Sequence, residues 1–200
     1  TIDMPLLALL KEAGCFSVHL SIDSTSEHVR EHVLHRHGRG DTQELIDKLQ
    51  LIGRYGINTW VNYMLAAPES TVQDDLATIR VSKRGQVTYA AYSTTVPMKG
   101  TPLYDYALAN SMIDLSSHRS DMTGCYEPST LACFSPHEKR IRYNVFLLGA
   151  IIAKLPWPID RMATWMIKLI PPNRTFRWLR AKMYHYYIEN KIFKLHGGKK

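Results

Sequence analysis

Two groups of side chains in this sequence have the residue types and spacing that chemistry requires. Asp23 ends the stretch VHLSID, whose apolar and polar residues alternate as in a half-buried strand. His28, His32 and His35 are spaced to share one face of a helix, and such spacing can hold a divalent metal. Since no carboxylate pattern completes a closed ligand set around them, we interpret these histidines as a solvated face and predict no metal site.

The cysteines point to a cellular compartment rather than to a site. Cys15, Cys125 and Cys133 are odd in number, and their spacings match no zinc or redox motif. Unpaired thiols are typical of a reducing environment, so we expect a cytoplasmic protein and not a disulfide scaffold.

Helix and strand patterns alternate along the first 110 residues. Apolar residues at helical spacing, with breaks at glycine and proline, predict helices over 5–13, from about 25, over 41–56, over 70–83 and from 101. Runs rich in β-branched and aromatic residues predict strands over 15–22, 57–67 and 86–96. Strands separated by helices in this way form right-handed parallel units whose carboxyl ends share one edge. We therefore expect Asp23 and the segments 66–70 and 97–101 to meet at that edge.

Several residues have the types expected at helix N-termini. A side-chain oxygen there accepts a hydrogen bond from a free backbone amide, and an acid or amide three residues later can return one. The matching pairs are Ser24 with Glu27, Asp41 with Glu44, and Ser70 with Gln73, and Thr101 precedes Pro102 in the same role.

Composition changes near residue 110, where we place a domain boundary between an α/β domain (1–110) and a mainly helical extension (111–200). Residues 1–136 carry 11 Lys and Arg against 15 Asp and Glu, whereas residues 137–200 carry 14 against 3. A local basic excess suits an anionic surface such as phospholipid headgroups or nucleic acid, or it is simply a solvated helix face.

Aromatic and basic residues interleave over 140–195, and two interpretations stay open. Such a segment can lie in the plane of a membrane interface, which would place the protein at the inner membrane surface through a peripheral contact. Alternatively, its helices pack on the α/β domain and bury their apolar faces. The longest apolar run, VFLLGAIIA at 145–153, is too short to span a bilayer.

Three segments match one series of family motifs in order and separation. EAGCFSVHLSIDSTSEHVR resembles AGC-x-x-V-x-x-GIESGSERV, GINTWVNYMLAAPESTVQDDL resembles GI-x-x-x-x-x-FMIGLPGETEEDI, and VPMKGTPLYDYA resembles PYPGTPLYD. Together they resemble the radical S-adenosylmethionine (radical SAM) enzymes, in particular the cobalamin-binding branch. The resemblance implies that residues 1–110 form the later half of a partial parallel β/α barrel, of the TIM-like kind, followed by the helical extension.

This resemblance also implies cofactors and a reaction. A [4Fe–4S] cluster would cleave S-adenosylmethionine to a 5′-deoxyadenosyl radical, with cobalamin-dependent methyl transfer or cyclisation on a small-molecule, lipid-like or tetrapyrrole-like substrate. The CxxxCxxC loop that would hold the cluster does not occur in this sequence. We therefore expect the cluster loop and any cobalamin domain to lie upstream, and the chain by itself to be inactive.

Carried over residue by residue, the resemblance implies cofactor contacts at two strand ends. Asp23 takes the place of the Glu in GIES and Ser24 that of the following Ser, beside the bound S-adenosylmethionine. Asn62, Met64 and Ala66 would lie on one side of the next strand, against the adenine. The alternatives are that Asp23 and Ser24 only cap a helix and that Met64 belongs to the core.

The third segment implies a substrate side at Pro97, Met98, Lys99 and Gly100. Lys99 could meet an anionic group there or be an ordinary surface lysine. Departures from the motifs, with Ala66 and Glu69 where the family has glycine, leave a second hypothesis open. This is a non-catalytic membrane- or RNA-binding module built on a degenerate barrel. Since no recognised RNA-binding module occurs in the sequence, we do not expect nucleic acid as a partner.

Overall fold

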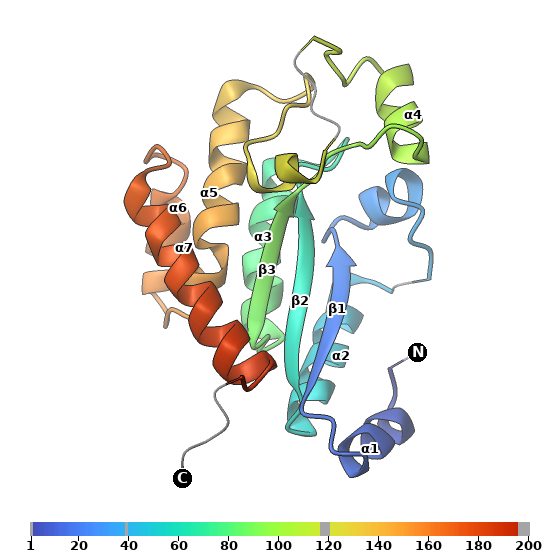
Figure 1. Cartoon of the computed structure of the whole chain (residues 1–200), viewed down its shortest axis with the longest axis vertical. Helices are drawn as coiled ribbons and strands as arrows, with labels where there is room; N and C mark the ends of the chain where they lie inside the picture. Colours follow the sequence, from blue (N-terminus) through green and yellow to red (C-terminus); the bar gives the residue numbers. More distant parts are fainter. Residues whose placement is uncertain (1, 39, 117–120, 196–200) are drawn as a thin grey trace.

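The computed structural model describes residues 2–38, 40–116 and 121–195. Three strands, β1 (Ser17–Asp23), β2 (Asn58–Leu65) and β3 (Tyr89–Thr94), form a parallel sheet in the order β1-β2-β3 (Figure 1). The helices before, between and directly after the strands are α1 (Met4–Glu12), the π-helical turn η1 (Val29–Val33), α2 (Thr42–Arg54), α3 (Val72–Arg84) and α4 (Pro102–Ala109). The remaining elements are the 3₁₀ turn η2 (Met122–Tyr126), α5 (Pro136–Ile152), α6 (Ile159–Met166), α7 (Arg174–Tyr187) and the π-helical turn η3 (Ile188–Ile192).

The predicted α/β class with parallel strands is confirmed, but the predicted barrel is not supported. Within the described residues the sheet has three strands and stays open, so it encloses no barrel interior. The alternation of strands and helices fixes parallel pairing through right-handed crossovers. Barrel closure depends on how many strands pair, which the local pattern of a few strands does not determine.

Strands β2 and β3 lie inside the ranges predicted from the sequence, and β1 ends at Asp23, one residue beyond its predicted range of 15–22. The helix expected from about residue 25 is short. Two predicted caps are confirmed: Asp41 accepts a hydrogen bond from the backbone N of Glu44 at 2.8 Å, and Thr101 accepts one from Tyr104 at 3.3 Å. The other two are wrong. Thr71 caps α3 in place of Ser70, and the Ser24 hydroxyl accepts from the backbone N of Ser26 at 3.2 Å.

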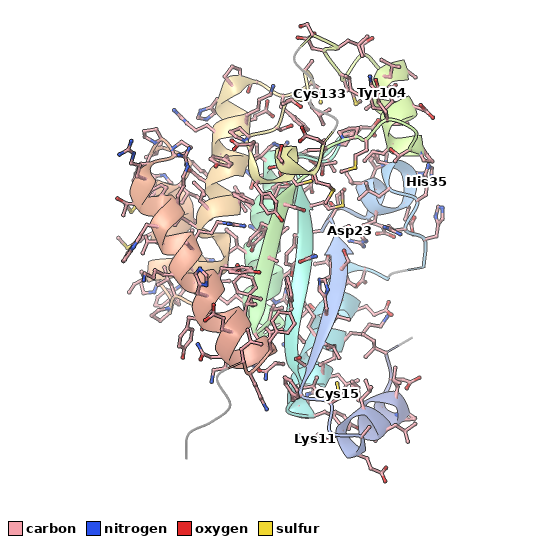
Figure 2. All side chains as sticks on the ribbon, in the orientation of Figure 1. Lys11, Cys15, Asp23, His35, Tyr104 and Cys133 are labelled. Carbon is pink, nitrogen blue, oxygen red and sulfur yellow. The ribbon has the colours of Figure 1, made fainter. Side chains whose placement is uncertain are left out.

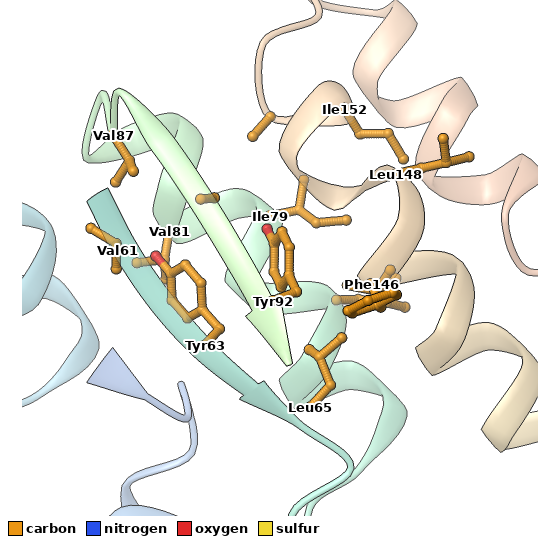
Figure 3. Close-up of a cluster of buried hydrophobic side chains, with 14 of the residues drawn as sticks. Val61, Tyr63, Leu65, Ile79, Val81, Val87, Tyr92, Phe146, Leu148 and Ile152 are labelled. Carbon is orange, nitrogen blue, oxygen red and sulfur yellow. The ribbon is translucent and has the colours of Figure 1, made fainter. Parts of the chain in front are cut away.

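One face of the sheet packs against α2, α3 and α5. Along β2 every second residue is buried, because successive side chains of a strand point to opposite faces. Val61, Tyr63 and Leu65 enter a cluster with residues of α3, and the ring of Tyr63 stacks on that of Tyr92 at 5.5 Å between centroids (Figure 3). Phe146 brings α5 into the same cluster.

The C-terminal helices pack beside and across the sheet. Helix α5 contacts both α3 and β3, and α7 lies against α5 (Figure 1). On the face opposite α3, Tyr89 of β3 is buried with Ile188 and Ile192 of η3. The packing interpretation of the segment 140–195 therefore holds for α5 and η3. The domain boundary near residue 110 stays a prediction, and α5 shares a core cluster with the strands across it.

No helix in the described ranges is both long enough and apolar enough to cross a membrane.

Candidate functional site

A cavity of about 390 Å³ opens at the carboxyl edge of the sheet. It brings together Asp23 at the end of β1, Met64 near the end of β2 and Thr101 directly after the turn that follows β3. Figure 2 shows Asp23 at this end of β1, below His35 of the following segment. The full lining is Asp23, Val33, Leu34, His35, Arg36, Met64, Thr101, Pro102 and Leu103. The carboxyl edge is where open parallel sheets bind ligands.

Asp23 is positioned by a break in strand pairing. The register between β1 and β2 shifts between Ser21 and Asp23, and Asp23 has a φ of 65°, a left-handed conformation that Asp adopts more readily than most residues. The residue is 4% exposed. Its carboxylate accepts a hydrogen bond from the Ser21 hydroxyl and lies 3.2 Å from Nε of Arg36, whose side chain is half exposed. The site thus holds a buried carboxylate beside a cation that solvent can reach.

Several residues at this edge of the sheet have a left-handed backbone conformation. Besides Asp23, positive φ values occur at His35 (52°), Ala66 (56°) and Glu69 (63°). Such conformations strain residues other than glycine and tend to persist at sites that require a particular geometry. The family motif has glycine at positions 66 and 69. Ala66 and Glu69 replace glycine there and still adopt the left-handed backbone conformation that glycine favours.

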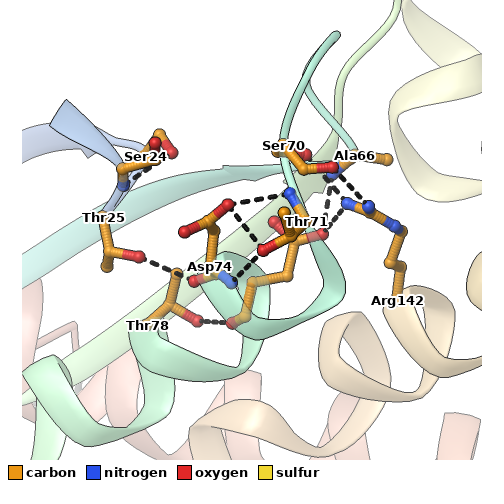
Figure 4. Close-up of polar contacts among 10 residues, drawn as sticks. Ser24, Thr25, Ala66, Ser70, Thr71, Asp74, Thr78 and Arg142 are labelled. Carbon is orange, nitrogen blue, oxygen red and sulfur yellow. Dashed lines mark hydrogen bonds and ion pairs between the residues drawn. The ribbon is translucent and has the colours of Figure 1, made fainter. Parts of the chain in front are cut away.

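A buried ion pair holds the turn between β2 and α3 in place (Figure 4). Asp75 accepts a hydrogen bond from the backbone N of Ala66 at 3.0 Å and pairs with Arg142 of α5. Arg142 also donates to the Ser70 hydroxyl at 2.9 Å and to the Ser70 carbonyl at 2.7 Å. Burial raises the pKa of Asp75 to about 6, although Arg142 acts in the opposite direction. Helix α5 therefore positions the end of β2.

Glu69 links three segments at the rim of this edge. Its carboxylate accepts a hydrogen bond from the Tyr106 hydroxyl of α4 and lies 2.6 Å from Nε2 of His28. The Tyr106 hydroxyl and then His28 hold the pKa of Glu69 below its usual range, and Glu69 raises the pKa of Tyr106. This cluster ties the turn after β2 to η1 and α4 outside the cavity.

The structure places the remaining predicted cofactor residues away from the cavity wall. Ser24 is buried, and its carbonyl accepts a hydrogen bond from Arg30 at 2.9 Å. Ala66 is fully buried. Asn62 lies two residues before Met64 on β2 and is partly exposed on the same face of the sheet. Of the five residues predicted to contact the cofactor, Asp23 and Met64 line the cavity.

None of the four predicted substrate-side residues lines the cavity, although they precede Thr101, which does. Pro97 is buried, and the Met98 carbonyl accepts a hydrogen bond from the Thr101 hydroxyl at 2.7 Å. Lys99 and Gly100 are exposed, and Gly100 has a φ of 83°. These residues form the turn that delivers Thr101 to the site.

Sequence reasoning missed Arg36 and the apolar wall formed by Leu34 and Leu103. Arg36 reaches Asp23 because the chain reverses after η1 at the left-handed residue His35. No spacing rule marks such a reversal. The glycines at 38 and 40 do indicate that the helical segment after β1 ends near this edge. They do not indicate that the side chain of Arg36 points toward Asp23.

The four histidines that follow β1 form two separate pairs of neighbouring rings. The rings of His28 and His32 lie 5.1 Å apart and those of His35 and His37 6.2 Å apart, measured between centroids. Among the residues that the structure describes, no group of three His, Cys, Asp or Glu side chains could hold a metal ion.

Comparison with known proteins gives one distant relative. No family model matches the chain. An uncharacterized methyltransferase of Pyrococcus horikoshii is 30% identical over 105 residues, which are 52% of this chain. The chain spans 22% of the length of that relative.

These findings overturn the resemblance to radical SAM enzymes. The relative is named as a methyltransferase, and neither that name nor the open three-stranded sheet indicates a fragment of a radical SAM barrel. The implied [4Fe–4S] cluster, cobalamin and radical cleavage are likewise without support, and the described residues include no metal-binding group. The motif strings misled because they report strand ends and turns, which parallel α/β proteins of different chemistry share.

Proposed function

We propose that the cavity at the carboxyl edge binds S-adenosylmethionine and that the chain is part of a methyltransferase acting on a small-molecule or lipid-like substrate. The buried carboxylate of Asp23 in this cavity is the observation that carries the proposal. The relative named as a methyltransferase supports the reaction class.

The residues of the cavity fit the parts of this cofactor. Its volume of about 390 Å³ lies within the range of small-molecule sites. Leu34, Met64 and Leu103 offer apolar walls for the adenine, and Asp23 offers acceptors for the ribose hydroxyls. Arg36 offers a partner for the carboxylate of the methionyl group. When bound, S-adenosylmethionine supplies an electrophilic methyl group on a sulfonium.

Each polar side chain has a defined task in this proposal. Ser21 donates to Asp23 and fixes the orientation of its carboxylate. Arg36 neutralises Asp23 while the cofactor is absent and, being half exposed, can turn toward the ligand without leaving the cavity. We place the methyl acceptor beside the turn 97–100, which borders the cavity through Thr101.

We also propose that the protein works in the cytoplasm. Cys15, Cys125 and Cys133 are all free thiols in the structure, as expected for a reducing compartment.

The proposal is tested by calorimetric titration of the whole chain with S-adenosylmethionine and with its demethylated product. Asp23→Asn keeps the size of the side chain and removes its charge. Because a hydrogen bond to a charged group contributes about 1.5–3 kcal/mol, this variant should bind about 10- to 100-fold more weakly. Asp105→Asn, an exposed carboxylate on α4 outside the cavity, is the matched control and should bind within about twofold of the wild type.

Circular dichroism and thermal unfolding establish that both variants are folded before affinities are compared. If the wild type shows no saturable binding of either compound, or if Asp23→Asn binds as tightly as Asp105→Asn, the proposal is wrong.

A further inference from the structure

Helix α6 carries an apolar face that the rest of the described chain leaves uncovered. Ile159, Met162 and Met166 recur at helical spacing on one side of the helix, and Leu169 continues the row in the next turn. We call these four residues, with Trp157 and Trp165, the α6 stripe. Its members are between 44% and 72% exposed. The inward side of the same segment is already used, because Ala163 and Ile167 pack on the main core cluster. The outward stripe therefore leaves a large part of its apolar surface exposed to solvent.

A basic cavity borders the stripe. It has a volume of about 300 Å³, lies between α3 and α6, and includes Trp165 of the stripe in its wall. Four cations line it, namely Arg80, Lys83, Arg161 and Lys168, against one carboxylate, Asp160.

The carboxylate in this cavity is already engaged. Lys83 donates to Asp160 at 2.5 Å and to the carbonyl of Leu155 at 2.8 Å. Within the described residues, no ion pair joins Arg80, Arg161 or Lys168 to an acidic side chain. Arg80, Arg161 and Lys168 therefore form no ion pair within the described chain. They surround a cavity large enough for a phosphate group.

We propose that this surface docks on a bilayer of anionic phospholipid, with the α6 stripe inserted at the headgroup level and a lipid phosphate in the basic cavity. Tryptophan together with aliphatic residues, bordered by Lys and Arg, is the composition of helices that lie in the membrane interface. Each Lys or Arg near an anionic leaflet adds to the electrostatic attraction between the protein and the membrane. The excess of basic residues over 137–200 has the same sign as the cavity.

Charge and shape favour lipid over the other occupants. A second copy of the chain joined stripe to stripe would bring Arg161 and Lys168 of both copies close together, where their charges repel. Nucleic acid would pair with the cations but would leave the aliphatic row exposed to water. An anionic bilayer satisfies both features at once, and it does so independently of whether the edge cavity binds S-adenosylmethionine.

The test is sedimentation of the whole chain with vesicles of phosphatidylcholine alone and of phosphatidylcholine containing about one third phosphatidylglycerol. We expect binding to the anionic vesicles that weakens steeply with added salt, and little binding to the neutral ones. Met162→Ser/Trp165→Ser should weaken binding to anionic vesicles at least about 10-fold, because it removes two inserted apolar side chains. Arg80→Gln/Arg161→Gln should weaken it about 10- to 30-fold and flatten the salt dependence.

The matched control is Met4→Ser/Leu9→Ser on α1, where both side chains are more than 60% exposed and lie outside the α6 stripe. This variant should bind vesicles like the wild type. Equal binding to neutral vesicles, no binding to anionic ones, or unchanged binding of the Met162→Ser/Trp165→Ser variant would overturn the proposal. So would sedimentation velocity that shows a dimer which the same double substitution dissociates, since the stripe would then be an interface between copies.

Discussion

At the scale of single residues, the carboxyl edge is shaped by side chains in unusual backbone conformations. Asp23, Ala66 and Glu69 all have positive φ, and each of them lies where a strand ends and the chain must turn sharply toward the next helix. Asp tolerates this conformation, whereas Ala gains nothing from it. The strain at Ala66 is maintained by its surroundings, because its backbone N donates to the buried carboxylate of Asp75.

The strain at Ala66 can be measured by comparing the same substitution at two neighbouring residues. Ala66 and Ala67 are both fully buried, so replacing either by Gly removes one buried methyl group, worth about 0.8 kcal/mol. At residue 66 the glycine also relieves a left-handed conformation that costs other residues about 1–2 kcal/mol. Because the loss of the methyl group is common to both variants, Ala66→Gly should be more stable to urea than Ala67→Gly by about 1–2 kcal/mol. Equal stabilities would show that the backbone at Ala66 is not strained.

Glu69 gives the rim of the site a dependence on pH with a defined sign. The Tyr106 hydroxyl and His28 lower the pKa of Glu69 in the folded protein, so the carboxylate stabilises the fold above its ordinary pKa. That contribution is lost as the pH falls through the lowered pKa. In thermal unfolding between about pH 6 and pH 3, the advantage of the wild type over Glu69→Gln should shrink toward the acid end. Glu12→Gln, an exposed carboxylate of α1, serves as the control, and an advantage independent of pH would contradict the assignment.

At the scale of helices and strands, the sequence was informative wherever the cause is local. The order of elements, the parallel edge and the caps at Asp41 and Thr101 follow from periodicity and from contacts within three residues. The same local reasoning predicts Ser70 as a cap, yet Ser70 binds Arg142, which lies 72 residues further along the chain. No pattern within a window of a few residues contains that partner.

The residues of the candidate site were predictable where they lie at strand ends. The prediction missed the residues that depend on contacts between segments far apart in the sequence. Asp23 and Met64 were found because strand ends share an edge. Arg36 lines the site through a reversal at His35, and the role of α5 depends on an ion pair between segments far apart in the sequence. The assignment of chemistry failed more completely, since motif strings describe turns and not the reaction performed beside them.

The ion pair between Asp75 and Arg142 should be costly to break on one side. Arg142→Met leaves a buried carboxylate without its partner and should destabilise the protein by about 3–5 kcal/mol in chemical denaturation. Asp75→Asn/Arg142→Met removes both charges and should recover a substantial part of that loss. Arg54→Met, an exposed residue of α2, should change stability by less than about 0.5 kcal/mol. If the double variant is no more stable than Arg142→Met, the loss arises from packing rather than from the unpaired charge.

At the scale of the whole molecule, the two candidate surfaces lie on different parts of the fold. The edge cavity is built from β1, β2 and the segments beside them, whereas the α6 stripe lies on α6 and the residues that flank it (Figure 1). Helix α5 stands between them. It provides Arg142 to the turn after β2 and Phe146 to the core, and it packs against α6 and α7.

This position of α5 determines how the chain should unfold. If residues 1–110 and 111–200 were separate folding units, α5 could open while the sheet stayed intact. Opening α5 alone would expose Phe146 and its neighbours in the shared cluster and leave Asp75 buried without Arg142. Both costs oppose a partial opening, so native-state hydrogen exchange should give amides of β2, β3 and α5 the same opening free energy and the same slope with denaturant. Exchange of α5 through an opening with a lower free energy and a shallower slope would instead place a real unit boundary near residue 110.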